Sequence, residues 1–180
     1  MPRDRSNLVW IDLETTGLSV ARHVILEIAS VVTDKELNVV AEGPDFVIHQ
    51  PDSALERLDP WCARQHGFSG LIESSRASDI SVREAERQTL SFIRKHTHRQ
   101  TAPLCGNSIQ MDRRFLRRYM AELNDHLSHR NVDVSSIAEL AARWYPGVAA
   151  KLDKAFPHRA AEDVRGAIDE LRFYRQLIFR

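Results

Sequence analysis

The stretch Leu8–Gly17 constrains this chain most, because an apolar strand there ends in two acids and a glycine turn. Alternate residues of a strand point to opposite faces, so Asp12 and Glu14 point the same way. Two carboxylates on one face of an apolar strand are costly unless a positive charge lies against them. A divalent cation would supply that charge, since hard cations prefer oxygen ligands. The alternative is a solvated strand end with two ordinary surface acids.

The composition is typical of an ordinary globular protein. The chain has 180 residues, 43% hydrophobic and 28% charged, so we expect one domain over residues 1–180. Lys plus Arg equals Asp plus Glu at 25 each, which disfavours a broad basic surface for long nucleic acid. Cys62 and Cys105 lack the spacing of a disulfide framework or a cysteine zinc site. With no leader or membrane-spanning run in the sequence, we expect a cytoplasmic protein without membrane contact.

Hydrophobic periodicity predicts an α/β fold, with a mixed sheet and helices packed on its faces. The predicted strands are Leu8–Leu13, Val24–Asp34, a third strand (Leu37–Ala41 and Phe46–His49) interrupted by Gly43-Pro44, Thr101–Cys105 and Asn131–Val134. The predicted helices are pieces broken at Gly67 and Gly70, Ser81–Lys95, Met111–Leu127, a helix to Trp144 capped by Ser135 or Ser136, and Ala160–Ile178. Short connections predict that the first three strands pair antiparallel, whereas helix-separated strands should pair in parallel.

Three further residues extend the opening pair into a possible catalytic group. Asp112 opens a predicted helix after a strand, Asp163 lies early in the last helix, and His158 precedes that helix. Each has an ordinary explanation, since acids favour helix N-termini and a lone histidine is usually a loop residue. Combined with Asp12 and Glu14, the acids could hold two divalent ions, and the histidine could deprotonate an attacking water.

Two other groups of residues favour structural interpretations. His96 and His98 could bind a metal, but a helix end that prefers positive charge explains them better. A basic stripe on the helix after Asp112 could contact RNA, although a solvated face paired with acids such as Glu122 is the simpler interpretation. This stripe consists of Arg113, Arg114, Arg117 and Arg118.

The chain resembles the DEDDh family of 3′-to-5′ exonucleases. The resemblance lies in three motifs in the family's order: Asp12-Leu13-Glu14-Thr15-Thr16-Gly17, Asp112, and His158-Arg159-Ala160-Ala161-Glu162-Asp163. Within the family it is similar to the oligoribonucleases, through Trp10-Ile11-Asp12-Leu13-Glu14, Cys105-Gly106-Asn107-Ser108-Ile109 and Asp133-Val134-Ser135. The resemblance implies a ribonuclease H-like fold in which Asp12, Glu14, Asp112 and Asp163 hold two Mg²⁺ or Mn²⁺ ions. It also implies that His158 is the general base.

The same resemblance implies a homodimer that trims short oligoribonucleotides, above all dinucleotides, from the 3′ end to 5′-mononucleotides. It implies that Leu18, Trp61 and His66 contact the bases, although Trp61 could instead be a core or interface residue. It further implies that Ser108 and Ser135, with Arg130 of a second subunit, cap the 5′ phosphate.

The sequence departs from the oligoribonuclease pattern at a few positions: Thr15, Met111, Ser128, His129 and Ala161. His129 stands where the family carries a functional tyrosine, and a histidine can still stack and donate a hydrogen bond. Thr15 is closer to the wider exonuclease group, so one alternative is an exonuclease for longer single-stranded RNA or DNA. The alternative from another class is a non-catalytic nucleic-acid-binding module on the same fold.

Overall fold

A computed structural model describes residues 3–150 and 158–179 of the chain. Its five-stranded sheet has the order β3-β2-β1-β4-β5. The strands are β1 Leu8–Thr15, β2 Ile25–Thr33, β3 Val39–Val47, β4 Leu104–Gly106 and β5 Asn131–Asp133. The first three strands pair antiparallel, whereas β1, β4 and β5 run parallel. The expected mixed sheet is therefore confirmed, with β1 at its centre.

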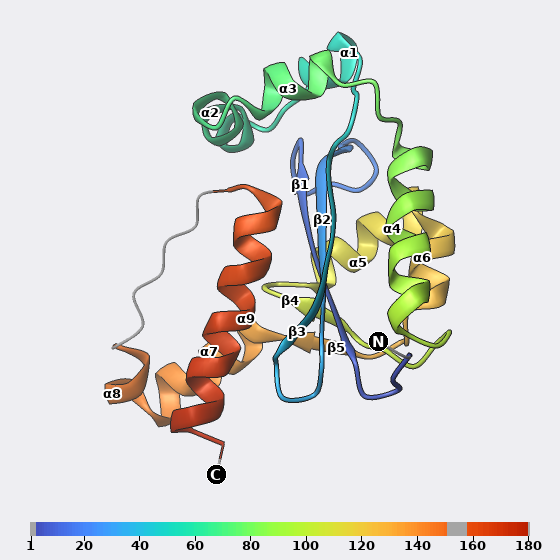
Figure 1. Ribbon diagram of the computed structural model, residues 1–180. Helices are drawn as coiled ribbons and strands as arrows, with labels where there is room; N and C mark the ends of the chain where they lie inside the picture. The colour runs from blue at the N-terminus through green and yellow to red at the C-terminus, as the bar shows by residue number, and fades with distance from the viewer. Residues whose placement is uncertain (1–2, 151–157, 180) are drawn as a thin grey trace.

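Helices cover both faces of the sheet and one of its ends (Figure 1). Those between β3 and β4 are α1 Asp52–Leu55, α2 Pro60–Phe68, α3 Leu71–Ala77 and α4 Val82–His96. Those after β4 are α5 Gln110–Tyr119, α6 Ala121–His126, α7 Val134–Trp144, α8 Pro146–Ala149 and α9 Ala160–Leu177. Figure 1 shows α4, α5 and α6 on one face, α7, α8 and α9 on the other, and α1 to α3 across the end of the sheet. No helix in the described ranges is long and apolar enough to cross a membrane.

The alternation of β1 divides the interior into two hydrophobic cores. Val9 and Ile11 pack on the α4–α5 side, whereas Trp10 packs on the α9 side. The buried indole of Trp10 donates to the hydroxyl of Thr33 at 3.0 Å, so its polar atom is satisfied. β1 runs to Thr15, two residues past its predicted end. Both Asp12 and Glu14 are therefore held in the strand on the α9 side.

The third strand is continuous, so the predicted interruption at Gly43-Pro44 is wrong. β3 is an edge strand, where a proline without an N–H is tolerated. Ala29 pairs with Asp45 and Val31 with Glu42, which leaves Gly43 and Pro44 opposite a single residue of β2 as a bulge. A Cβ at Gly43 would lie 2.3 Å from the hydroxyl of Ser30, so this bulge requires glycine.

The predicted helix Met111–Leu127 is two helices, because the chain breaks between α5 and α6 at Met120. This buried residue adopts φ −137° and ψ 59°, outside the helical region. Glu86 of α4 compensates for the break. Its carboxylate accepts hydrogen bonds from the backbone N–H groups of Glu122 and Leu123, at 2.8 and 3.1 Å. A helix start capped from a distant element leaves no local sequence signal.

Helix α7 begins at Val134, with Asp133 as its N-cap, so neither Ser135 nor Ser136 caps it as predicted. Ser136 instead donates to the carboxylate of Asp133 at 2.6 Å. The predicted break at Gly67 is also absent, since that residue lies inside α2. Gly70 does break the chain, at φ 71° before α3.

Arg113 does not belong to a solvated arginine face, because its side chain is buried. Its guanidinium donates to the carbonyls of Ser128 and Arg130 and to the side chains of Asn124 and Asn131. It thus ties α5 to the segment that enters β5. Helical spacing places Arg113 beside exposed arginines, but it cannot show that carbonyl acceptors lie within reach.

Candidate active site

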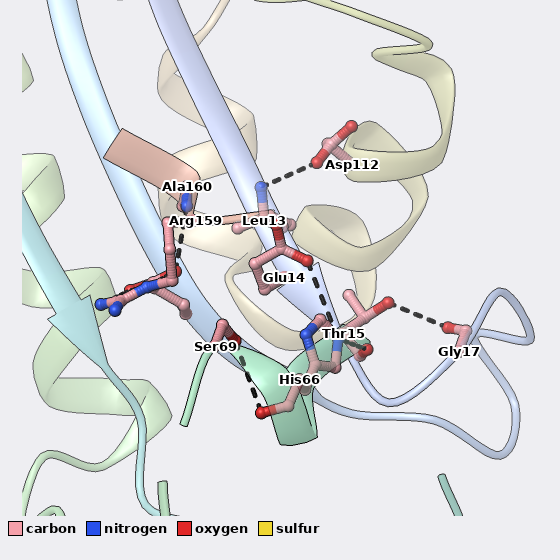
Figure 2. Close-up of polar contacts among 10 residues, drawn as sticks. Leu13, Glu14, Thr15, Gly17, His66, Ser69, Asp112, Arg159 and Ala160 are labelled. Atoms are coloured by element: carbon pink, nitrogen blue, oxygen red, sulfur yellow. Dashed lines mark hydrogen bonds and ion pairs between the residues drawn. The ribbon is translucent and has the colours of Figure 1, made fainter. Parts of the chain in front are cut away.

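The candidate site lies at the C-terminal end of β1, where the sheet opens. β4 pairs with β1 only at Val9 and Trp10, and then turns away at Gly106. Beyond that point β4 no longer pairs with β1, so side chains can occupy the space beside this edge of β1. Asp112, in the first turn of α5, accepts a hydrogen bond from the backbone N–H of Leu13 at 3.0 Å (Figure 2). This bond positions the Asp112 carboxylate against the strand that carries Asp12 and Glu14.

The other predicted residues reach the same point from α9. His158 precedes the helix in a left-handed conformation, φ 55°, and Asp163 lies in the first helical turn. The backbone N–H of Asp163 donates to the carbonyl of Arg159 at 3.0 Å, which places the carboxylate at the start of the helix. Ligand atoms of Glu14, His158 and Asp163 all lie within 4.8 Å of one another.

The four acids interact electrostatically, as the shifts in their pKa values show. Burial, followed by repulsion from Asp112 and Glu14, raises the pKa of Asp12 well above its usual range. Burial and then the charge of Asp163 raise the pKa of Glu14 to about 8. Burial raises the pKa of Asp112 to about 7 and that of Asp163 to about 6. Burial and repulsion thus disfavour the ionised forms of these acids, and a bound positive charge would stabilise them.

The donor set fits a divalent cation. One carboxylate oxygen of Asp163, Oδ1, is buried and has no hydrogen-bond partner within residues 3–150 and 158–179. Buried polar atoms are rarely left unpaired, so this oxygen is available to a bound group. All four acids offer hard oxygen ligands, the type that Mg²⁺ and Mn²⁺ prefer. A cation bound among them would also offset the burial and the repulsion that raise their pKa values.

These side chains line a cavity of about 350 Å³, together with most of the predicted binding residues. The cavity lining includes Asp12, Glu14, Asp112, His158, Asp163, Leu18, Trp61, His66 and Ser108. Leu18 is 72% exposed and Trp61 is 48% exposed, so the interpretation of Trp61 as a core residue is wrong. The ring of Trp61 meets that of His158 edge-on, with 5.1 Å between centroids. This wall of the cavity thus presents apolar and aromatic surface beside the histidine.

His66 differs from the other wall residues because it is buried and held by the end of β1. Its Nε2 lies 2.9 Å from the carbonyl oxygen of Thr15 and 3.7 Å from a carboxylate oxygen of Glu14 (Figure 2). Burial, the largest effect, lowers the pKa of its imidazole. His66 therefore links α2 to the strand that carries the acids.

The predicted phosphate-cap residues are brought together only in part. The backbone N–H of Ser108 donates to Oγ of Ser135 at 3.0 Å, and the two hydroxyl oxygens lie 3.3 Å apart. His129 and Arg130, which the structure describes and which are exposed, do not line the cavity of their own chain.

Two residues near this site were not predicted from the sequence, Glu27 and Arg159. Glu27 lies in β2, directly opposite Glu14, and it is fully buried. Arg159 pairs with it from the start of α9. One sequence feature could have identified Glu27, namely an acid within a strand rich in Val and Ile. A buried carboxylate in such a strand is costly without a partner. The same reasoning that selects Asp12 and Glu14 would have selected Glu27.

Comparison with known proteins agrees with this geometry. The family model RNase_T, described as "Exonuclease", matches residues 9–171. The oligoribonuclease of Marinobacter nauticus is 52% identical over 173 residues, 96% of this chain and 96% of that protein. The oligoribonuclease of Acinetobacter baylyi is 49% identical, over 97% of this chain and 95% of that protein. The chain belongs to the oligoribonuclease family of exonucleases. The resemblance in the motifs is thereby confirmed, and with it the expected enzyme class of 3′-to-5′ exoribonuclease at the level of the family.

Solved structures confirm the ribonuclease H-like fold. The zinc-bound complex of E. coli exonuclease I with single-stranded DNA superposes with a TM-score of 0.77 at 17% identity. The match covers 98% of this chain and 42% of exonuclease I. Exonuclease I from Methylocaldum szegediense gives a TM-score of 0.73 at 18% identity, over 96% of this chain and 41% of that one. The chain therefore shares its fold with one part of these larger proteins.

Proposed function

We propose that this member of the family acts on very short RNA, dinucleotides above all, and releases 5′-mononucleotides from the 3′ end within a single domain, residues 1–180. The observation that carries the proposal is one small cavity that unites four acids, a histidine and an exposed tryptophan. Its volume of about 350 Å³ is near the lower end for ligand sites, which suits one nucleotide better than a long strand.

Asp12, Glu14, Asp112 and Asp163 would hold two Mg²⁺ or Mn²⁺ ions. Such ions supply charge stabilisation for the attacking and leaving oxygens of a phosphodiester. The unpaired Oδ1 of Asp163 and the raised pKa values of the acids support this assignment. The chain's own contribution is to fix the acids on β1, α5 and α9, which all meet at the open end of the sheet.

His158 would act as the general base that takes a proton from the attacking water. A positioned imidazole is the side chain that enzymes use most often as a general acid or base. The edge of Trp61 against the ring of His158 would limit the histidine's freedom. Trp61 and Leu18 would hold the 3′ base between them, with His66 behind, and stacking on an aromatic ring is tolerant of base identity.

The hydroxyls of Ser108 and Ser135 would close the site at the 5′ phosphate, with Arg130 supplied by the second copy in a homodimer. The exposed position of Arg130, outside its own cavity, supports this arrangement. An arginine fork on one phosphate gives local recognition without a basic groove, in keeping with the chain's zero net charge. Leu140 and Trp144 are exposed on α7, 44% and 67%, and give the chain apolar surface for a partner.

We place the enzyme in the cytoplasm. Cys62 and Cys105 are both buried and unpaired. Free thiols persist in a reducing compartment, which is consistent with that location.

The test compares a 5′-labelled dinucleotide with a long single-stranded RNA of the same 3′ sequence, each incubated with Mg²⁺. We expect faster release of mononucleotide from the dinucleotide. Faster trimming of the long RNA would contradict the preference for short substrates. Binding of RNA without any release of mononucleotide would instead indicate a non-catalytic binding module.

A further inference from the structure

Among the acids of the five described strands, Glu27 alone has no exposed surface. It lies in β2 at the position paired with Glu14, so both side chains leave the sheet on the same side. A charged carboxylate in such a position is costly unless the protein supplies partners for it. Its partners therefore define what the residue does.

Within residues 3–150 and 158–179, the hydrogen-bond partners of the Glu27 carboxylate lie at the start of α9. Arg159 donates from Nε at 2.9 Å and from Nη2 at 2.6 Å to Oε1 of Glu27. The backbone N–H of Ala160, the first residue of the helix, donates to Oε2 at 2.9 Å. Figure 2 shows Arg159 and Ala160 on one side of β1 and Asp112 on the other. One carboxylate thus binds a side chain and a backbone group of adjacent residues.

This contact fixes the chain between two proposed site residues. His158 directly precedes Arg159, and the carbonyl of Arg159 accepts a hydrogen bond from the backbone N–H of Asp163 at 3.0 Å. The position of Arg159 therefore constrains the backbone at His158 and the helical turn that carries Asp163. Glu27 lies in β2, which has a paired strand on each side. Its contact with Arg159 therefore restrains both residues relative to the sheet.

We propose that Glu27 and Arg159 form a positioning pair that sets His158 and Asp163 against the acids of β1. The inference rests on the proposed function, since it assigns the pair to that same site. Glu27 and Arg159 touch neither substrate nor metal in this scheme. They act through the first turn of α9.

The charge of Arg159 serves the pair in a second way. Glu27 adds to the repulsion felt by Asp12, Glu14 and Asp163, whereas Arg159 opposes it at Glu14. Without the guanidinium, Glu27 would be one more uncompensated acid beside the cluster. The guanidinium of Arg159 therefore offsets the repulsion that Glu27 adds to the neighbouring acids.

The first test is Arg159→Gln, because Arg159 is partly exposed and lies outside the sheet. The matched control is Arg165→Gln, which breaks the exposed pair between Arg165 and Glu42 one and a half turns along the same helix. For Arg159→Gln we expect a fall of about 10- to 100-fold in kcat and in Mn²⁺ affinity, with KM for a dinucleotide unchanged. Arg165→Gln should match wild type in all three.

The second test uses Glu27→Gln alone and combined with Arg159→Gln. An amide at position 27 keeps an acceptor for the N–H of Ala160, but it turns N–H groups towards a guanidinium that has only donors. The double variant removes this conflict, so its kcat should exceed that of Glu27→Gln. Normal kcat and Mn²⁺ affinity in Arg159→Gln would overturn the inference, as would a raised KM with kcat unchanged, which would place Arg159 on the substrate.

Failure of this inference is distinguishable from failure of the proposed function. If wild type releases no mononucleotide, the proposed function fails. Mn²⁺ affinity, measured by calorimetry with the metal alone, still tests the positioning pair in that case. An equal loss of Mn²⁺ affinity in Arg159→Gln and Arg165→Gln would indicate general damage to α9 and would overturn the pair.

Discussion

Glu14 and Glu27 face each other across neighbouring strands, yet the protein treats the two carboxylates in opposite ways. Glu27 receives a guanidinium and a helix N–H, so the chain itself compensates its charge. Glu14 has the carboxylates of the other acids around it and His66 at 3.7 Å, and the guanidinium of Arg159, which is paired with Glu27, only partly opposes the rise in its pKa. Burial is similar at the two positions, so the difference lies in the partners.

This difference distinguishes a structural acid from one that is kept for a ligand. Where a buried acid has its cation within the chain, the pair stabilises the fold. Where several buried acids share no cation, the fold bears their repulsion, and an external cation can relieve it. Such a balance of stability against function is expected at active sites.

The largest effect should come from removing one acid of the uncompensated cluster. We expect Asp12→Asn to lower kcat for dinucleotide cleavage by about 10³-fold or more, because several kcal/mol of charge stabilisation depend on the bound metal. The measurement is mononucleotide release under saturating Mg²⁺. Activity within a few-fold of wild type would remove Asp12 from the site.

The loss expected at His158, the proposed general base, begins lower but overlaps that range. His158→Gln should reduce kcat by roughly 10²- to 10⁴-fold, the usual contribution of a general base. Mg²⁺-induced stabilisation should persist in this variant, since the four acids remain. If His158→Gln abolished metal binding as well, the histidine would be a metal ligand rather than the base.

The comparison between the two glutamates becomes sharpest in the stability of the metal-free protein. Glu14→Gln should stabilise it, because an amide is neutral without the proton that the buried carboxyl of Glu14 must take up. Glu27→Gln should destabilise it by about 1–3 kcal/mol, because hydrogen bonds to a charged group are lost. Urea unfolding in EDTA measures both. Changes of the same sign would mean that the two positions do not differ as described.

The smallest effect concerns pH. Acids with raised pKa values bind more protons in the folded than in the unfolded chain, so the stability that this provides is lost as pH rises from about 4 towards 8. We expect the free energy of unfolding of the metal-free protein to fall as pH rises through this window. The urea midpoint, followed against pH in EDTA, checks this. A flat profile would show that the acids are not strained.

The sequence was sufficient for the parts of the fold that rest on local patterns. Strand β1, the capped helix α4 and the last helix lie within a residue or two of their predicted ends, because apolar periodicity and capping are local. The break at Met120 was missed because Glu86, far along the chain, caps the second helix. Gly43 and Pro44 predict an interruption locally, whereas the structure has a bulge there whose close approach to Ser30 no local pattern shows.

The site was predicted in a similarly divided way. The five residues that the motifs select all line the cavity, and their types and order can be recognised from the sequence alone. The ion pair of Glu27 and Arg159 joins positions 132 residues apart, which no local pattern can show. Arg113 was misjudged for the same reason, because its acceptors are backbone carbonyls of another segment.

The central claim is that the acids of β1, α5 and α9 are held together for a divalent cation. The most direct measurement is the thermal unfolding midpoint against Mg²⁺ concentration, for wild type and for Asp12→Asn. The account predicts that the midpoint of wild type rises with Mg²⁺, whereas that of Asp12→Asn begins higher and responds little. A wild-type midpoint that does not depend on Mg²⁺, or an equal rise in both proteins, would contradict it.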